Sequence, residues 1–485
     1  MKKHLCSTTI HTNGTFTSAP ALINFSRSKF RPRREEYVVY LKKRYPDLQV
    51  IDVTQTVWNE DKYPKNGYTL VINSATMELY NLTGELVQKK RGVLQQSIDI
   101  AENPDFNRII NKILGKSNPI YLLKYMNKFT FPFEDNPAVF NISPDLGIVD
   151  FWASKLNQYR MFSKLGIPIA DFKIIHSEEK FWRTVENFGF SVFVSKDRGS
   201  SGSGKFLAST REEIERELKK FEETLKEGTE LFENLIICKR LDVFISPSVG
   251  AITDGETTIV GGISEQILKN GVSFRGNRWP LSKEISTENI KEIIEITKVI
   301  GKEIGKPREG ISDKGYKGIF NIDFIITPNG KIYFAEINPR NFGHYPQINK
   351  TIKYVVKWTN FAELDLWVNE GRTFDEFPGL CASEFESKMC YEPHGCELAW
   401  VLKEFSNPNR DLKFTEDIGN FPLEEIMEKR MMGTFDFPGT GIKILKKDPA
   451  FHVFIVGENR EEAEKKSNND IFFSTFFEKH GLICD

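Results

Sequence analysis

Two carboxylates in one predicted β-hairpin have the type and spacing needed for chemistry. Residues 319–327 alternate in polarity and are rich in Phe and Ile, as expected of a half-buried strand. The Asn-Gly pair at 329–330 predicts a two-residue type I′ turn, because that turn needs positive φ at both central positions. The register that follows places Asp323 directly opposite Glu336 on one face of the hairpin.

The same register predicts which other residues face each other across the hairpin. One polar pair should share the face of the two carboxylates, and three pairs should form an apolar face. The expected pairs are Asn321 with Asn338, Ile322 with Ile337, Phe324 with Ala335 and Ile326 with Tyr333.

The opposed carboxylates suggest a metal site. Carboxylates in this position lie roughly 5 Å apart at Cβ and repel each other, and a cation between them would remove the repulsion. A solvated hairpin edge is the plain alternative. An Ile and a Pro-Arg pair flank the acids at fixed offsets, so we favour the metal site. The predicted ligands are Asp323, Glu336 and Asn338, which suit Mg²⁺, with Mn²⁺ as the alternative ion and substrate phosphates completing the shell.

A glycine- and serine-rich loop follows the predicted strand 191–195, which Lys196 closes. Loop glycines let backbone N–H groups converge on phosphate oxygens, and serines add further donors. We therefore predict a phosphate flap in preference to a flexible connection. Its residues are Ser200, Ser201, Gly202, Ser203 and Gly204.

The loop nearly matches the Walker A pattern but does not fulfil it. Gly199, Gly204 and Lys205 have the required spacing, whereas Phe206 stands where a Ser or Thr must bind Mg²⁺. The segment after the loop is strand-like and is not a helix whose N-terminus could hold phosphate. We therefore exclude the P-loop fold.

Composition and charge limit the class of protein. The chain has 485 residues, too many for one ordinary core, and its 40% hydrophobic and 27% charged residues are typical of soluble proteins. A net charge of −1 gives no bulk attraction to nucleic acid or membrane. We find no run of about 18 apolar residues, and we expect no signal peptide because the basic N-terminus lacks an apolar h-region. The six scattered cysteines indicate reduced thiols, so we expect a cytoplasmic protein.

The remaining elements must position these residues. Residues 1–147 alternate between helix and strand signals and lack a Gly-rich dinucleotide fingerprint, so we assign no cofactor there. Long helices are predicted at 148–165, 288–304 and 351–370. The first of these carries Lys155.

Together, the elements of residues 148–350 resemble the ATP-grasp superfamily of carboxylate ligases. The motifs that carry the resemblance are, in order, a helix with Lys155 that ends in LGIP, a strand ending at Lys196 before the Gly-Ser loop, a strand with Lys239 and Leu241, and Asp323 followed by EINPR at 336–340. The resemblance implies an α/β fold with α+β lobes. Its parts would be an N-terminal α/β domain at 1–147, a small lobe at 148–232, a large lobe at 233–370 and a C-terminal cap at 371–485.

The resemblance also implies a role for each site residue. Lys155 and Lys196 would contact the phosphates of ATP, and the loop at 200–204 would close over them. The acid pair with Asn338 would hold Mg²⁺, and Arg340 would stabilise the developing oxyanion. Adenine would be bound by Cys238, Lys239, Arg240 and Leu241.

Three positions depart from the pattern of the superfamily. Cys238 stands where many members have an adenine-binding Glu, and Asp242 is the nearest candidate for the ribose-binding acid. Asn321 stands where D-alanine–D-alanine ligases have an oxyanion Arg, and Arg340 would take that task, as in the carboxylase branch. More narrowly, the motifs SPSV at 246–249, SEQIL at 264–268 and FRGNRWP at 274–280 are similar to peptide ligases of the pheganomycin-biosynthesis type.

The leading hypothesis is an ATP-dependent ligase that activates a substrate carboxylate as an acyl phosphate, joins it to an amine and releases ADP and phosphate. The candidates for holding the carboxylate are Arg340 with Arg275 and Arg278, which lie in a long polar connection, because guanidinium binds carboxylate bidentately. His344 is a candidate base for the amine, although a lone His near a loop is more often structural.

Two alternatives stay open at this point. The acceptor could be the thiol of a carrier protein instead of an amine. The chain could also be a nucleotide-binding protein without catalysis, as the Cys at position 238 suggests. The expected partners are a small carboxylate and a small amine, each an amino acid, peptide or similar compound, and a homodimer is left open.

Overall fold

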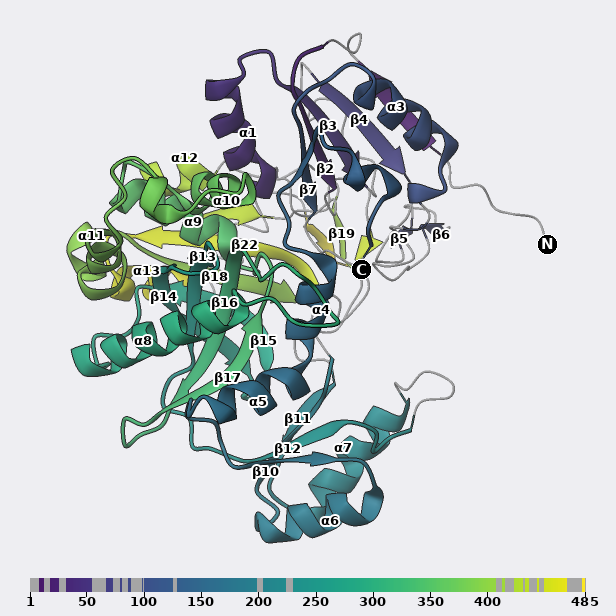
Figure 1. Ribbon diagram of the computed structural model, residues 1–485. Helices are drawn as coiled ribbons and strands as arrows, with labels where there is room; N and C mark the ends of the chain where they lie inside the picture. Colours follow the sequence, from purple (N-terminus) through teal and green to yellow (C-terminus); the bar gives the residue numbers. More distant parts are fainter. Residues whose placement is uncertain are drawn as a thin grey trace.

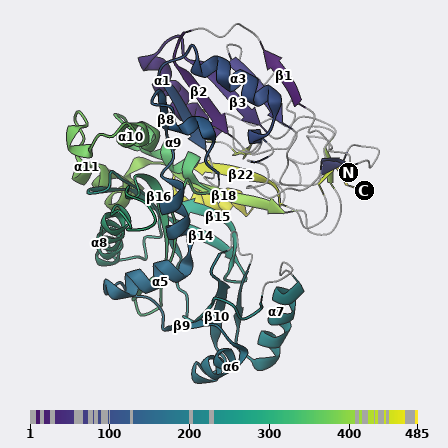
Figure 2. The ribbon, with the colours of Figure 1, turned by 45° about the vertical axis from the view of Figure 1, so that its right-hand side comes forward.

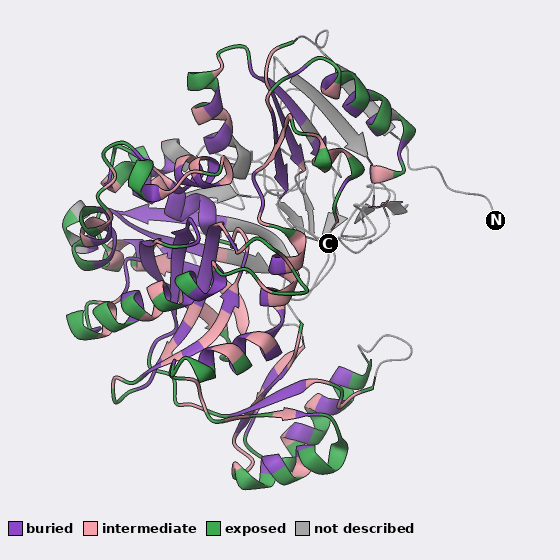
Figure 3. Ribbon diagram, in the orientation of Figure 1, coloured by how far each residue is buried: buried purple, intermediate pink, exposed green. Residues whose placement is uncertain are grey.

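The computed structural model describes residues 8–12, 18–25, 32–54, 67–72, 79–80, 86–88, 98, 100–124, 129–198, 204–223, 230–406, 412–414, 423–430, 432–435, 443–444, 449–468 and 482–484. Figures 1 and 2 show the N-terminal region at the top, a small lobe at the bottom and the largest sheet between them. In Figure 3 the strands of that central sheet are mostly buried, whereas the outward faces of the surrounding helices are exposed.

The N-terminal region is built on a mostly parallel sheet in the order β1-β4-β3-β2-β7-β8, with β1 antiparallel at one edge. The apolar residues described in β2, β3 and β7 are almost all buried, as expected of a parallel sheet covered by helices. The strands are β1 Thr8–Thr12, β2 Ala21–Phe25, β3 Gln49–Thr54, β4 Gly67–Ile72, β7 Ile120–Lys124 and β8 Val139–Asn141. The helices are α1 Pro32–Arg44, α3 Pro104–Leu114 and the short η3 Pro132–Asp135.

The small lobe is an antiparallel sheet in the order β11-β10-β12-β9, with α6 and α7 on one face. Its strands are β9 Phe172–Ile175, β10 Val192–Lys196, β11 Lys205–Ala208 and β12 Leu235–Lys239. Its helices are α6 Glu178–Asn187 and α7 Arg211–Glu223. Ser177 caps α6 by accepting a hydrogen bond from the N–H of Lys180, and the apolar residues of both helices pack on the sheet.

The single helix predicted at 148–165 is wrong, because the chain forms two helices there, α4 Leu146–Ala153 and α5 Lys155–Lys164. Ser154 interrupts them with an extended backbone and caps α5 by accepting from the N–H of Asn157. Asp197, just after β10, accepts hydrogen bonds at one carboxylate oxygen from the hydroxyl of Ser154 (2.7 Å) and the N–H of Leu156 (3.0 Å). The break therefore fixes Lys155 at the first position of α5, against the small lobe.

The large sheet has the order β17-β16-β13-β14-β15-β18-β22-β20 among the described strands. The strands are β13 Pro247–Thr253, β14 Thr258–Lys269, β15 Ser273–Trp279, β16 Gly318–Ile326, β17 Ile332–Asn338, β18 Ala399–Ser406, β20 Met432–Phe435 and β22 Pro449–Gly457. The predicted cap therefore shares a sheet with the large lobe, because β15 pairs with β18. A smaller antiparallel sheet contains β5 Leu79–Tyr80, β6 Leu86–Gln88, β19 Leu412–Phe414, β21 Lys443–Ile444 and β23 Leu482–Cys484.

Helices α8, α9 and α10 pack on the large sheet. α8 Thr287–Ile304 agrees with the helix predicted at 288–304, whereas the one predicted at 351–370 is instead two helices, α9 Tyr345–Val355 and α10 Phe361–Asn369. Lys357 lies between them and has a φ of 73°, and a right-handed helix cannot continue through a residue with positive φ. The remaining helical segments are η4 Phe374–Glu376, α11 Ala382–Glu386, η5 Ser387–Tyr391, η6 Pro393–Cys396, α12 Leu423–Glu428 and α13 Arg460–Ser467.

The hairpin of β16 and β17 has the predicted register at its functional end and a different one near its turn. Asp323 faces Glu336, with Ile322–Ile337 and Asn321–Asn338 beyond it, as predicted. Nearer the turn the predicted pairs are wrong, since Phe324 faces Phe334 and Ile326 faces Ile332.

A three-residue loop and a β-bulge explain the difference. The N–H of Gly330 bonds to the carbonyl of Thr327 (2.8 Å), and the N–H of Thr327 bonds to the carbonyl of Lys331 (3.0 Å), so Pro328 joins the turn. Only the glycine of the Asn-Gly pair has positive φ, at 77°, and the type I′ prediction is therefore wrong. Ala335 is then the extra residue of a bulge, which restores the predicted register at the carboxylates.

Candidate active site

A cavity of about 380 Å³ lies between the small lobe, α5 and the edge of the large sheet. Lys155 and Tyr159 of α5 line it together with Asp323 and Glu336. Gln158 fixes this geometry, because its side chain donates to the carbonyl of Ile337 and accepts from the N–H of the same residue, both at 3.0 Å. The glutamine thus takes the place of a neighbouring strand at the outer edge of β17.

The two carboxylates interact through their charges. Burial and then the charge of Glu336 raise the pKa of Asp323 to about 6. Burial alone would raise the pKa of Glu336 as well, but the ammonium groups of Lys155 and Lys205 outweigh it and hold that pKa below its usual range. Lys155 Nζ lies 3.0 Å from Glu336 Oε1. The two carboxylates therefore repel each other, and the positive charges of the two lysines offset part of that repulsion.

Polar side chains hold Asp323 in place from the neighbouring strand. Ser248 Oγ on β13 donates to Asp323 Oδ1 at 2.8 Å, and Asn321 Nδ2 donates to Ser248 Oγ at 2.9 Å. Ser248 faces Asp323 in the pairing of β13 with β16. The predicted SPSV motif contains this serine, but its contact with the acid depends on a pairing that the sequence alone does not specify.

Asn338 and Arg340 complete the metal side of the cavity. Asn338 Nδ2 donates to Asp323 Oδ2 at 3.4 Å, while its Oδ1 accepts from Arg340 Nη2 at 3.1 Å. For Asn338 to offer its oxygen to an ion between the carboxylates, its amide must turn over. Among the described residues, no cluster of three or more His, Cys, Asp or Glu could hold a metal ion by itself. Two opposed carboxylates and one amide fit Mg²⁺ when substrate phosphates supply further oxygens.

The expected adenine end lies between β10, β12 and the following loop. Cys238, Lys239 and Leu241 line the cavity, whereas Arg240 donates to Ser209 Oγ at 2.7 Å and is not among the described lining residues. Cys238 Sγ donates to the hydroxyl of Tyr159 at 3.8 Å, and burial raises the pKa of the thiol to about 12. The position that the superfamily often gives to Glu is therefore occupied by a neutral side chain.

Only part of the predicted phosphate flap belongs to the described residues. Ser200, Ser201, Gly202 and Ser203 lie outside the described residues. Gly204 accepts a hydrogen bond at its carbonyl from the N–H of Lys196 (2.8 Å). Neither residue lines the cavity among the described positions, and Lys196 Nζ lies 4.8 Å from the ring centre of Phe221. Lys205, which the sequence presented only as part of a false Walker motif, does line it.

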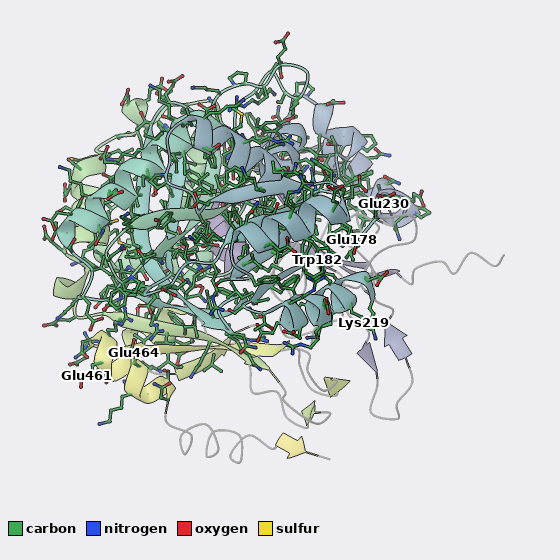
Figure 4. The ribbon with its side chains drawn as sticks, turned by 90° about the horizontal axis from the view of Figure 1, so that it is seen from below. Glu178, Trp182, Lys219, Glu230, Glu461 and Glu464 are labelled. Atoms are coloured by element: carbon green, nitrogen blue, oxygen red, sulfur yellow. The ribbon has the colours of Figure 1, made fainter. Side chains whose placement is uncertain are left out.

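Of the predicted substrate arginines, the structure brings Arg340 to the cavity. Arg275 and Arg278 are absent from the described lining residues. Arg278 is ion-paired at 3.1 Å with both Glu265 on β14 and Glu464 on α13, a helix labelled in Figure 4 at Glu461 and Glu464. It therefore joins the large lobe to the C-terminal part of the chain.

His344 lies at the cavity wall and is buried. Its Nε2 is 3.1 Å from Ser264 Oγ, which itself donates to the carbonyl of Ser248 (3.1 Å). Because the single hydroxyl proton of Ser264 goes to that carbonyl, Nε2 of His344 carries the proton of its own hydrogen bond. This contact fixes the ring at the wall of the cavity.

Comparisons with known proteins identify the fold. No family model matches the chain. The carbamoyl phosphate synthase large chain of Clostridium botulinum is 26% identical over 257 residues, covering 53% of this chain and 22% of that protein. Formate-dependent phosphoribosylglycinamide formyltransferase of Ignicoccus hospitalis is 25% identical over 183 residues, covering 36% of this chain and 42% of that protein. The matches thus span less than half the length of these curated relatives.

A solved structure extends the likeness to nearly the whole chain. The biotin carboxylase domain of Hydrogenobacter thermophilus 2-oxoglutarate carboxylase, solved with MgADP, ADP and bicarbonate, has a TM-score of 0.61 and 14% identity, covering 97% of this chain and 92% of that one. Its domain is of the ATP-grasp type. This chain has the ATP-grasp fold.

Within the ATP-grasp fold, the residues that the sequence did not reveal share one property. Ser248, Lys205, Gln158 and Asp197 act through strand pairings or helix contacts between distant segments, and their local sequence carries no pattern for them. Ser248 and Lys205 fell inside motifs noticed for other reasons. Among the helices of the described segments, none combines the length and apolar character needed to cross a bilayer.

Proposed function

We propose that this ATP-grasp chain is an ATP-dependent ligase, which activates a substrate carboxylate as an acyl phosphate, joins it to an amine and releases ADP and phosphate. The observation that carries the proposal is the pairing of Asp323 with Glu336 at the wall of a cavity between two sheets. Lys155 and Arg340 lie beside them and add positive charge where phosphates would sit. Similarity to a carbamoyl phosphate synthase and to a formate-dependent formyltransferase supports activation of a small carboxylate-like substrate.

Each cavity residue has a task in this proposal. Asp323, Glu336 and Asn338 would hold Mg²⁺, which would supply positive charge to offset that of the phosphates. Lys155 bonds Glu336 and keeps that acid ionised, so the ligand set is charged at neutral pH. Arg340 offers a guanidinium to the substrate carboxylate and to the oxyanion that forms when the amine attacks.

The finer parts of the proposal concern the acceptor and the domains. We propose an amino acid or peptide amine as the acceptor, as in the peptide ligases that the SPSV and FRGNRWP motifs resemble. We also propose that lobes 148–232 and 233–370 close on the nucleotide. The cap at 371–485 would move together with the large lobe. The shared sheet and the Arg278–Glu464 ion pair support that arrangement of the cap.

Product analysis tests the reaction class. The purified chain is incubated with MgATP and panels of carboxylates and amines, and nucleotide products are separated by ion-exchange chromatography. ADP and phosphate should appear only with a productive acid, whereas AMP and pyrophosphate would indicate adenylation and contradict the proposal. Asp323→Asn and Glu336→Gln should abolish turnover, and Glu461→Gln, an exposed acid on α13, is the matched control. Full activity in Asp323→Asn would exclude this metal site.

A further inference from the structure

Two lysines flank the glycine-serine loop, and the strands that carry them show which one can reach the cavity. β10 and β11 pair so that Ser195 faces Lys205 and Phe193 faces Leu207. The side chains of two paired residues lie on the same face of a sheet, and successive side chains along a strand alternate between the two faces. Phe193, Lys205 and Leu207 all line the cavity. Lys205 is therefore on the cavity face of the small lobe.

Lys196 lies on the opposite face. It continues the alternation of Val192 and Val194, which are buried in the core of the small lobe together with Phe221. Its ammonium stands 4.8 Å from the ring centre of Phe221 on α7, a cation–π distance. Burial lowers the pKa of Lys196, in keeping with a side chain that lies against the lobe.

The charge of Lys205 is directed at the metal hairpin. Lys205 lines the same cavity as Asp323 and Glu336, so its ammonium and the two carboxylates attract each other. Within the described part of the chain Lys205 makes no ion pair, whereas Lys155 is paired with Glu336 at 3.0 Å. A phosphate chain between the two walls would meet Lys205 from one side and the acid pair, with its cation, from the other.

We propose that Lys205 is the lysine with which the small lobe binds the phosphates of the nucleotide, and that Lys196 stabilises the lobe through Phe221 instead. This inference rests on the proposed function, because it needs a nucleotide in this cavity. An ammonium is a compact cation with three donors and can bond several phosphate oxygens at once.

Matched variants separate the two lysines. Lys205→Met and Lys196→Met remove one charge each and keep the length of the side chain. Binding of MgATP, MgADP and adenosine is measured by isothermal titration calorimetry, with thermal melting as the check on folding. Lys205→Met should weaken MgATP and MgADP by about 10- to 100-fold, the usual effect of losing a charged hydrogen bond, and leave adenosine unchanged. Lys196→Met should keep both affinities within about threefold.

Lys205→Arg keeps the charge and should recover most of the affinity, which also provides a folded variant should the Met variant not fold. Loss of MgATP binding in Lys196→Met with wild-type affinity in Lys205→Met would overturn the inference. So would an equal loss of adenosine and MgATP in Lys205→Met, since the lysine would then act on adenine or on the fold. A wild-type chain that binds no nucleotide would instead refute the proposed function itself.

Discussion

Replacing Asp323 by Asn should stabilise the unliganded protein while removing its function. Burial and the opposed Glu336 raise the pKa of Asp323 from 3.8 to about 6. At about 1.4 kcal/mol per pKa unit, the ionised form costs at most about 3 kcal/mol of stability. Asp323→Asn removes that cost but leaves an amide N–H₂ facing Asn338 Nδ2, whose amide must turn and lose its bond to Arg340, worth about 1 kcal/mol. The expected gain is therefore about 2 kcal/mol.

The gain must depend on pH in one direction. The pKa of Asp323 is higher in the folded than in the unfolded chain, so its ionisation opposes folding. The penalty is fully present above the folded pKa of about 6 and vanishes below the ordinary value of 3.8. The free energy of unfolding of Asp323→Asn should thus exceed that of the wild type most at pH 8. The difference should shrink as the pH falls through 6 towards 4.

Urea unfolding in EDTA at pH 8 and pH 5 measures this difference, with Glu461→Gln as the control for loss of a surface acid. Mg²⁺ with ATP should then stabilise the wild type and not Asp323→Asn, because ligand binding stabilises only the state that binds it. Equal stabilities at pH 8, or a difference that grows towards pH 5, would show that the carboxylates do not repel each other as described.

Three further predictions concern the surroundings of the site. Gln158→Leu should destabilise the protein by about 2–4 kcal/mol in urea unfolding, because it leaves the buried N–H and carbonyl of Ile337 unpaired; a change below about 0.5 kcal/mol would contradict this. Arg278→Ala should lower stability by about 1 kcal/mol and leave the KM for the carboxylate unchanged, whereas a raised KM at wild-type stability would restore its predicted role in substrate binding. Iodoacetamide at pH 8 should label exposed Cys381, whose pKa is lowered by the hydroxyl of Ser383, much faster than Cys238, whose pKa is about 12; peptide mass spectrometry showing equal rates would refute this.

The metal hairpin could be predicted from sequence because its signals are local. Alternating apolar residues and an Asn-Gly pair indicated two strands and a turn, and the pairing of Asp323 with Glu336 is confirmed. The turn type was wrong, because Pro328 enters the loop and shifts the register by one residue. The bulge at Ala335 shifts it back. The carboxylates were thus placed correctly by two deviations that offset each other.

The predicted helix boundaries are wrong where contacts with distant segments break a helix. The pattern of residues 148–165 is apolar at helical spacing throughout, and only the bonds from Asp197 to the start of α5 reveal the break at Ser154. Without those bonds, the exact position of Lys155 beside Glu336 does not follow from the sequence.

The side-chain direction of a strand residue was the other quantity that the sequence could not supply. Lys196 and Lys205 both flank the predicted flap, and one residue of alternation decides which faces the cavity. Arg278 likewise lies in a region with the expected charge, but Glu464, 186 positions later, binds it. These outcomes depend on long-range pairing, whereas the order of motifs was sufficient to predict the ATP-grasp fold.

Mg²⁺-dependent nucleotide binding tests the central claim most directly. Titration of MgADP into the wild type, Glu336→Gln and the Glu461→Gln control by calorimetry, each with and without EDTA, separates the site from the rest of the surface. We predict binding in the wild type and the control that EDTA weakens by at least about tenfold, and little response to EDTA in Glu336→Gln. Equal, Mg²⁺-dependent binding in all three proteins would show that Glu336 is not a ligand of the metal, which contradicts the account.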